Sequence, residues 1–128
     1  MDAPTISRTF APSLAMTLDV LAAEIELAGA RCIFLDRVIG EVMEKLCESE
    51  RARLLEGMHG VDLLAQHLTS LSAFARGLSA AVPEEATVAV GGALSEVTLG
   101  ALVERMTAGL GGEADDADSA DAGDLDLF

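Results

Sequence analysis

The sequence predicts an all-α protein, and three observations lead to this fold class. Hydrophobic residues make up 51% of the 128 residues, which is enough for a core. Alanine and leucine dominate while tryptophan and tyrosine are absent, a composition that favours helices over β-sheets. Apolar residues also recur at alternating spacings of three and four through two long segments, as in coiled-coil-like helices. We therefore expect a long antiparallel helical hairpin.

The first helix is predicted to begin at Ser13. Residues 1–12 contain two prolines and no apolar periodicity, so we interpret them as a flexible N-terminal lead, and Ser13 is a suitable N-cap. Ten apolar positions then follow one another at spacings of four and three: Leu14, Leu18, Leu21, Ile25, Ala28, Cys32, Leu35, Ile39, Val42 and Leu46. Gly29 and Gly40 inside this pattern indicate either the close approach of another helix or a slight bend.

A second long helix is predicted after a turn at the polar cluster Glu48–Arg51. The apolar stripe resumes beyond this cluster and stops at Pro83; its members are Leu54, Val61, Leu64, Leu68, Leu71, Ala75, Leu78 and Val82. Two helices of this length cannot bury a full stripe against each other alone. We therefore expect a homodimer that forms a four-helix bundle.

A short third helix and an acidic tail are predicted to follow the hairpin. Residues 84–92 hold a short alternating run and two glycines, which suits a connector or a brief extended segment. Ala93–Ala108 is predicted as a helix that packs on the hairpin and is ended by glycines. Residues 13–110 would thus form the helical domain. Residues 111–128, rich in Asp, Ala and Gly, are predicted to be a disordered acidic linker.

The end of the tail differs in character from the linker before it. Apolar and acidic side chains alternate there, a pattern typical of a docking peptide on a solvated tether, although a frayed terminus without function is the simpler alternative. The residues concerned are Asp124, Leu125, Asp126, Leu127 and Phe128.

The net charge and the hydropathy pattern restrict the class of partner. The formal net charge is −14, and residues 113–128 hold seven acids and no base, which leaves 15 acids against 8 bases in residues 1–112. This sign argues against binding of nucleic acid or of an anionic membrane surface, so we expect a protein partner. No signal-peptide pattern and no apolar run of about 18 residues occurs, which predicts a cytoplasmic protein.

The two cysteines predict neither a disulfide nor a metal site. Cys32 and Cys47 fall 15 residues apart in one predicted helix, roughly 22 Å along its axis. A disulfide requires Cα atoms within about 7 Å. Their small number and the lack of a Cys/His ligand spacing fit a reducing compartment and no bound metal.

Asp62 and Gln66 are the candidate functional residues. Positions i and i+4 lie on one face of a helix, so a carboxylate and a carboxamide at this spacing can act on the same target. We expect this face at the flank or outside of the hairpin, together with His59 and Ser70. A solvated helix face without function stays open as the alternative from spacing alone.

In combination, the hairpin, this motif and the tail resemble the CheZ family of chemotaxis response-regulator phosphatases, including the shorter CheZ-like proteins of the CheT type. That family has a long helical hairpin that dimerises into a four-helix bundle, with Asp-x-x-x-Gln on the second long helix. A flexible linker then leads to a C-terminal peptide that docks on the response regulator. The resemblance covers residues 13–82 as architecture, residues 62–66 as motif and the acidic tail.

The resemblance implies a function for both motif residues. Gln66 would insert into the receiver domain of a phosphorylated CheY-like regulator and orient water in line with its aspartyl phosphate. Asp62 would contact the active-site lysine of that partner, and the Mg²⁺ would belong to the partner, with no cofactor in this chain. An acyl phosphate is already reactive, so an uncharged amide that fixes the water can accelerate hydrolysis. This chain has Leu64-Ala65 where the family commonly has Thr-Gly.

Two other classes of function stay open. His59 and His67 lie on the second predicted helix, as phosphoacceptor histidines do in relay proteins, although ordinary exposed histidines explain them more simply. A non-catalytic helical adaptor that binds another chemotaxis protein, such as a methyltransferase, would explain the apolar stripe equally well. There is no Gly-x-Ser-x-Gly motif and no phosphate-binding loop ending in Gly-Lys-Ser/Thr, so a metabolic enzyme is not expected.

Overall fold

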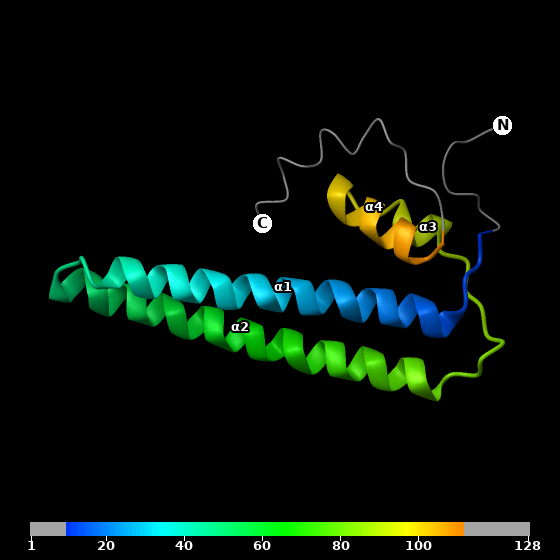
Figure 1. The fold of residues 1–128 in the computed structure, drawn as a ribbon, viewed down its shortest axis with the longest axis horizontal. Helices are drawn as coiled ribbons and strands as arrows, with labels where there is room; N and C mark the ends of the chain where they lie inside the picture. Colours follow the sequence, from blue (N-terminus) through cyan, green and yellow to red (C-terminus); the bar gives the residue numbers. More distant parts are fainter. Residues whose placement is uncertain (1–9, 112–128) are drawn as a thin grey trace. The chain divides into compact units, whose positions relative to one another are not determined.

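A computed structural model of the chain describes residues 10–111, and these residues are mostly helical (Figure 1). The helices are α1 (Leu14–Met43), α2 (Glu48–Ala81), α3 (Gly91–Leu94) and α4 (Gly100–Gly109). Within residues 10–111 no strand forms, and extended pairing is limited to one antiparallel bridge between Ser13 and Thr87. The predicted all-α class is confirmed. The predicted lead, apart from residues 10–12, and the acidic tail beyond Gly111 lie outside the described residues.

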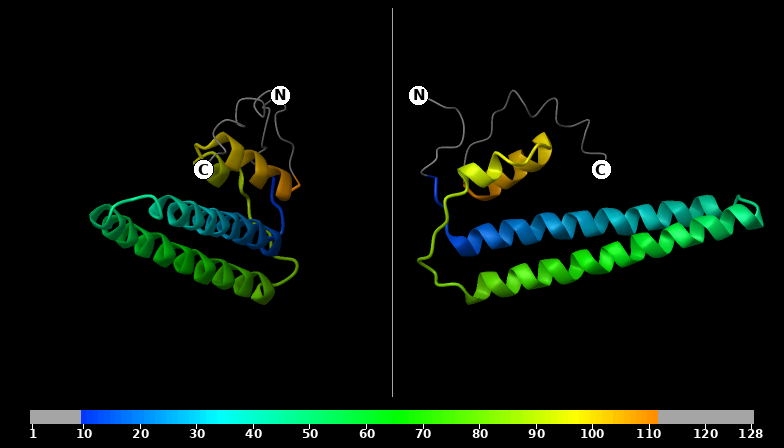
Figure 2. Two further views of the ribbon diagram at one scale, coloured as in Figure 1. Left: turned by 60° about the vertical axis from the view of Figure 1, so that its left-hand side comes forward. Right: turned by 180° about the vertical axis from the view of Figure 1, so that it is seen from behind.

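Two compact units share the long helices. One unit is Ala22–Phe74, and the other combines residues 10–21 with residues 75–111. Helices α1 and α2 run antiparallel and side by side in all three ribbon views (Figures 1 and 2). The predicted pair of long, mutually packed helices is therefore confirmed. No helix among the described residues is long and apolar enough to cross a membrane.

Small side chains form much of the seam between α1 and α2. Ala22 and Gly29 of α1 and Ser72 and Ala75 of α2 are buried. A Cβ added at Gly29 would lie 3.8 Å from the Cβ of Leu68, an ordinary contact distance. Positions of lower exposure recur along α2 at spacings of three and four: Leu54, Met58, Val61, Ala65, Leu68, Ser72, Ala75, Ser79 and Val82.

The predicted apolar stripe is only half right, because the seam uses a different neighbouring row of each helix. Partly buried members of the stripe in α1 are Leu18, Ile25, Cys32 and Ile39. The other large members are exposed, and their exposed fractions range from 39% to 53%: Leu21, Leu35, Val42, Leu64, Leu71 and Leu78. Smaller side chains take their place at the seam. Both rows satisfy the spacing of three and four, and small residues win because they let the two helices pack closely.

The hairpin turn precedes its predicted position. Helix α1 ends at Met43 and α2 begins at Glu48, so the cluster Glu48–Arg51, predicted as the turn, forms the start of α2. Glu48 and Glu50 suit this position because carboxylates stabilise the positive end of the helix dipole. The Arg51 side chain also donates a hydrogen bond of 3.0 Å to the main-chain oxygen of Leu46 in the turn. Cys47 therefore lies in the turn and not in one helix with Cys32.

A second core lies in the unit formed by residues 10–21 and 75–111. Val90, Leu94 and Leu110 are buried there. The partly buried side chains packed against them are Phe10, Val20, Val88, Val103 and Met106. Main-chain hydrogen bonds from Val88 to Pro12 (3.0 Å) and from Val90 to Phe10 (3.3 Å) tie the connector to the residues before α1. The predicted brief extended segment thus has a structural role in this unit.

The third predicted helix, Ala93–Ala108, is instead divided into α3 and α4. The hydroxyl of Ser95 donates a hydrogen bond of 2.6 Å to the main-chain oxygen of Gly92, and Leu99 is extended with ψ of 113°. Local bonding by serine and the β-branched pair that follows it both weaken a helix, which explains the break. Helix α4 ends at Gly109 as predicted, and Gly111 has a φ of 89°, a value that favours glycine.

Candidate functional site

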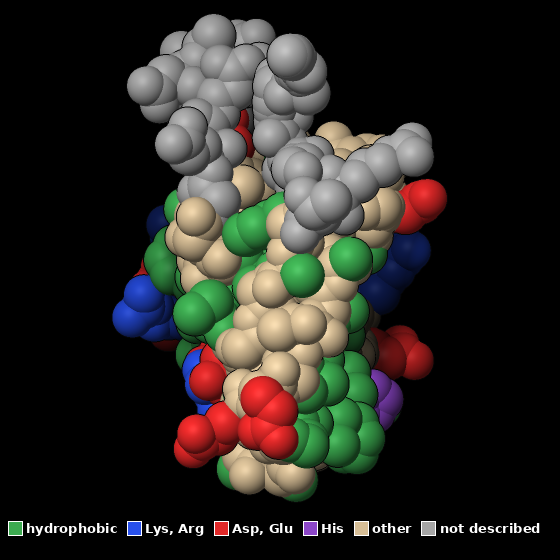
Figure 3. Space-filling model, turned by 90° about the vertical axis from the view of Figure 1, so that its right-hand side faces the viewer, with side chains coloured by type: hydrophobic (Ala, Val, Ile, Leu, Met, Phe, Trp, Pro, Cys, Tyr) green, Lys and Arg blue, Asp and Glu red, His purple; other side chains and the backbone are tan. Residues whose placement is uncertain are grey.

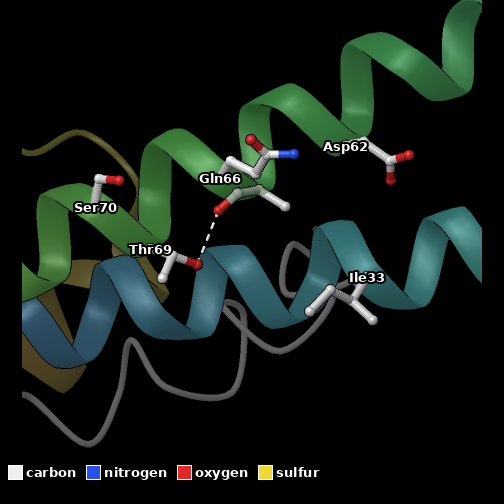
Figure 4. A pocket seen from close by; sticks show the side chains of 6 residues that line it. Ile33, Asp62, Gln66, Thr69 and Ser70 are labelled. Carbon is white, nitrogen blue, oxygen red and sulfur yellow. Dashed lines mark hydrogen bonds between the residues drawn. The ribbon is translucent and has the colours of Figure 1, made fainter.

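A shallow, solvent-open groove of about 540 Å³ lies on the flank of the Ala22–Phe74 unit. Its lining residues are Ile33 of α1 and Asp62, Ala65, Gln66, Thr69 and Ser70 of α2 (Figure 4). Asp62 and Gln66 are both exposed, and the helix places them one turn apart on the same flank. The structure thus brings the two motif residues into one groove, with Ser70 beside them.

The Gln66 side chain is not engaged within the described part of the chain. Its carboxamide extends along α2 on the side of Asp62 (Figure 4), and no hydrogen bond holds it to any other residue between 10 and 111. The neighbouring Thr69 hydroxyl is engaged, because it donates a hydrogen bond of 3.0 Å to the main-chain oxygen of Ala65. The groove therefore presents one free amide group, which can both donate and accept hydrogen bonds.

Asp36 of α1 brings a second carboxyl group to Asp62. The protonated Asp36 carboxyl donates a hydrogen bond to Asp62, and this contact, followed by partial burial and by the negative charge of Asp62, raises the pKa of Asp36. Oδ1 of Asp36 is buried, and residues 10–111 provide no donor for it when the group is ionised. A proton or an external cation between the two carboxyl groups would relieve their repulsion.

Large apolar side chains flank the groove on both sides. Ile33, which lines it, is 65% exposed, and its neighbour Phe34 is 57% exposed. The guanidinium carbon of Arg37 lies 5.3 Å from the centre of the Phe34 ring, at cation–π distance. On α2, Leu63 is 53% exposed next to Asp62. Exposed apolar side chains gathered around polar ones are typical of a surface that binds a partner.

The other predicted site residues lie away from the groove or outside the described residues. His59 and His67 are exposed on α2, and neither lines the groove. Asp124–Phe128 belongs to the part of the tail that the structure does not describe. Within residues 10–111, no group of three or more His, Cys, Asp or Glu side chains could hold a metal ion.

The fold and the groove define a helical-hairpin protein with an open polar site and no enclosed cavity around it. The chain belongs to a family described as a domain of unknown function, DUF8776, whose model matches residues 11–128. The match extends from the start of the described residues through both long helices, α3 and α4 to the last residue of the tail. No curated protein and no solved structure matches the chain.

Proposed function

We propose that the protein binds the phosphorylated receiver domain of a CheY-like response regulator in the cytoplasm and promotes hydrolysis of its aspartyl phosphate. The observation that carries this proposal is the pairing of Asp62 with a free Gln66 carboxamide in one open groove. An open groove on a helix flank suits a reaction whose phosphoryl group is presented by another protein. A small substrate would be better held in an enclosed pocket.

In this proposal the Gln66 carboxamide positions the attacking water. The water oxygen forms the new bond to phosphorus, the bond to the partner's aspartate oxygen breaks, and the aspartate leaves as a carboxylate while the phosphate takes the proton. The amide need not be a base, because an acyl phosphate is reactive and the barrier is lowered mainly by orientation. Asp62 would hold the partner's lysine, and the partner would supply Mg²⁺.

A homodimer forming a four-helix bundle is part of the proposal. Within the Ala22–Phe74 unit, Leu35 and Val42 are seven residues apart, as are Leu64 and Leu71, and all four side chains are at least 41% exposed. In an antiparallel pair of helices, two such rows next to the seam meet on one side. Asp62 and Gln66 occupy the rows of the opposite side, so a second copy packed on the leucines would leave the groove open. Exposed apolar side chains are visible as green patches in Figure 3.

The proposal is tested by the lifetime of the phosphoryl group on a regulator encoded near this protein. The wild-type protein is expected to shorten this lifetime, and Gln66→Ala is expected to abolish the effect while binding persists. His67→Ala, an exposed position outside the groove, serves as the control and should act like the wild type. If no cognate regulator loses phosphate faster in the presence of the protein, the catalytic proposal is wrong.

A non-catalytic adaptor is the second candidate function. The exposed apolar side chains around the groove favour it, since a binding surface needs no chemistry. A pull-down that returns a methyltransferase or another chemotaxis protein, and no receiver domain, would favour the adaptor. A histidine relay would require acid-labile phosphate on His59 or His67 after incubation with a phosphodonor kinase.

A further inference from the structure

The apolar side chains beside the groove have no part in the proposed hydrolysis. Ile33, Phe34 and Leu63 are each more than half exposed, and they stand on both sides of Asp62 and Gln66. Burial of such side chains against a partner contributes roughly 25 cal/mol for each Å² of apolar surface removed from water. Their position around the polar pair therefore indicates a second role for this flank, namely recognition.

We propose that Ile33, Phe34 and Leu63 form a docking surface for the receiver domain, with Asp36 joining Asp62 as a receptor for a cationic side chain of that partner. The inference rests on the proposed function, because it takes the receiver domain as the occupant. It adds residues of α1 to a site that the motif alone would confine to α2.

The composition of the docking surface suits a folded protein. Protein interfaces are enriched in aromatic side chains and arginine, and a few such residues carry most of the binding energy. Phe34 is the aromatic residue here, and Arg37 lies at cation–π distance from its ring, which restricts both side chains before a partner arrives. Because less side-chain freedom is then lost on association, this pair is suited to be the anchor of the surface.

Charge complementarity specifies what the partner presents at the centre. Asp36 and Asp62 repel each other when both are ionised, and the buried Oδ1 of Asp36 has no donor within residues 10–111. An ammonium group between them would neutralise the repulsion and supply the missing donor. A partner with a lysine surrounded by apolar side chains therefore fits this surface, whereas an acidic partner would be repelled.

The test measures the dissociation constant of the full-length protein for a regulator activated with beryllofluoride. Phe34→Ala and Ile33→Ala are each expected to weaken binding about tenfold or more, the size of effect that anchor residues show. Phe74→Ala is the matched control, because Phe74 is also exposed (65%) but does not line the groove. Asp36→Asn is expected to weaken binding and to reduce its dependence on salt. Phosphate release at saturating protein should stay unchanged for Phe34→Ala, because its side chain does not touch the reacting atoms.

The possible results separate this inference from the proposed function. Failure of the wild-type protein to bind any cognate regulator would overturn the proposed function, and with it the occupant named here. Normal wild-type binding with unchanged affinity for Phe34→Ala and Ile33→Ala would overturn the docking surface alone. An equal loss for Phe74→Ala would also overturn it, because the partner would then use another side of the hairpin. Circular dichroism checks that each variant keeps its helices.

Discussion

The carboxyl groups of Asp36 in α1 and Asp62 in α2 meet at the edge of the hairpin seam, and their hydrogen bond raises the pKa of Asp36. A carboxyl group with a raised pKa binds more protons in the folded state than in the unfolded state. The free energy of unfolding therefore falls as the pH rises from the ordinary aspartate range through the raised pKa. At neutral pH this pair lowers stability, a property more typical of a binding site than of a structural contact.

Asp36→Asn is expected to raise the melting temperature at neutral pH, because it removes one of two facing negative charges. The difference from the wild type should shrink as the pH falls below the ordinary aspartate range, where both carboxyl groups are protonated in the folded and unfolded states. Thermal unfolding followed by circular dichroism across this pH range measures the effect. A variant less stable than the wild type at every pH would show that Asp36 contributes a favourable contact instead.

Gly60→Ala is expected to raise the free energy of unfolding by about 0.5–1 kcal/mol, since glycine in a helix interior is less favourable than alanine. A Cβ at Gly60 would meet nothing within 4 Å among the described residues. Gly109→Ala is the contrasting variant, because its Cβ would lie 3.1 Å from Cγ2 of Val20. Urea unfolding compares the two. Equal stabilisation by both substitutions would mean that Val20 yields without cost.

Leu64→Glu and Leu71→Glu are expected to dissociate the proposed homodimer, because each places a charge in an apolar interface. Leu55→Glu is the matched control, since Leu55 is 47% exposed, close to the 49% of Leu64, and lies in the row on the groove side. Sedimentation equilibrium gives the mass of each variant. A monomeric wild-type protein, or an unchanged mass for both interface variants, would contradict the proposed four-helix bundle.

Deletion of residues 124–128 is expected to weaken capture of the regulator more than it slows hydrolysis once the regulator is bound. A tethered docking peptide raises the effective concentration of the partner at the groove without touching the reacting atoms. Phosphate release measured over a range of regulator concentrations separates the two effects. The same binding before and after the deletion would exclude the docking role of the tail.

Cys47 is expected to react with iodoacetamide faster than Cys32 near neutral pH. Hydrogen bonds from the Ser49 hydroxyl and then from the main chain of Glu50 lower the pKa of the Cys47 thiol, whose side chain is exposed. The thiolate is the reactive form, so a lower pKa gives more of it. Ser49→Ala should shift the pH profile of the reaction upward. Mass spectrometry of the two alkylated peptides would contradict the assignment if both cysteines reacted at the same rate.

The sequence by itself determined the all-α class, the two long helices and the position of Asp62 and Gln66 on one flank. These features depend on local properties, namely helix propensity, a spacing of three and four, and the rotation of about 100° per residue. The glycine at the end of α4 also followed from local chemistry, because only the backbone conformation at that point matters.

Only the tertiary structure decided which row of each helix forms the seam. Rows one position apart have the same spacing, and the preference for Ala22, Gly29 and Ser72 over the larger leucines depends on how closely the two helices can approach. The same packing brings Ile33 and Asp36 of α1 to residues of α2 that are distant in sequence. A spacing rule within one helix cannot find such neighbours, because contacts between helices depend on register, which packing of the whole hairpin sets.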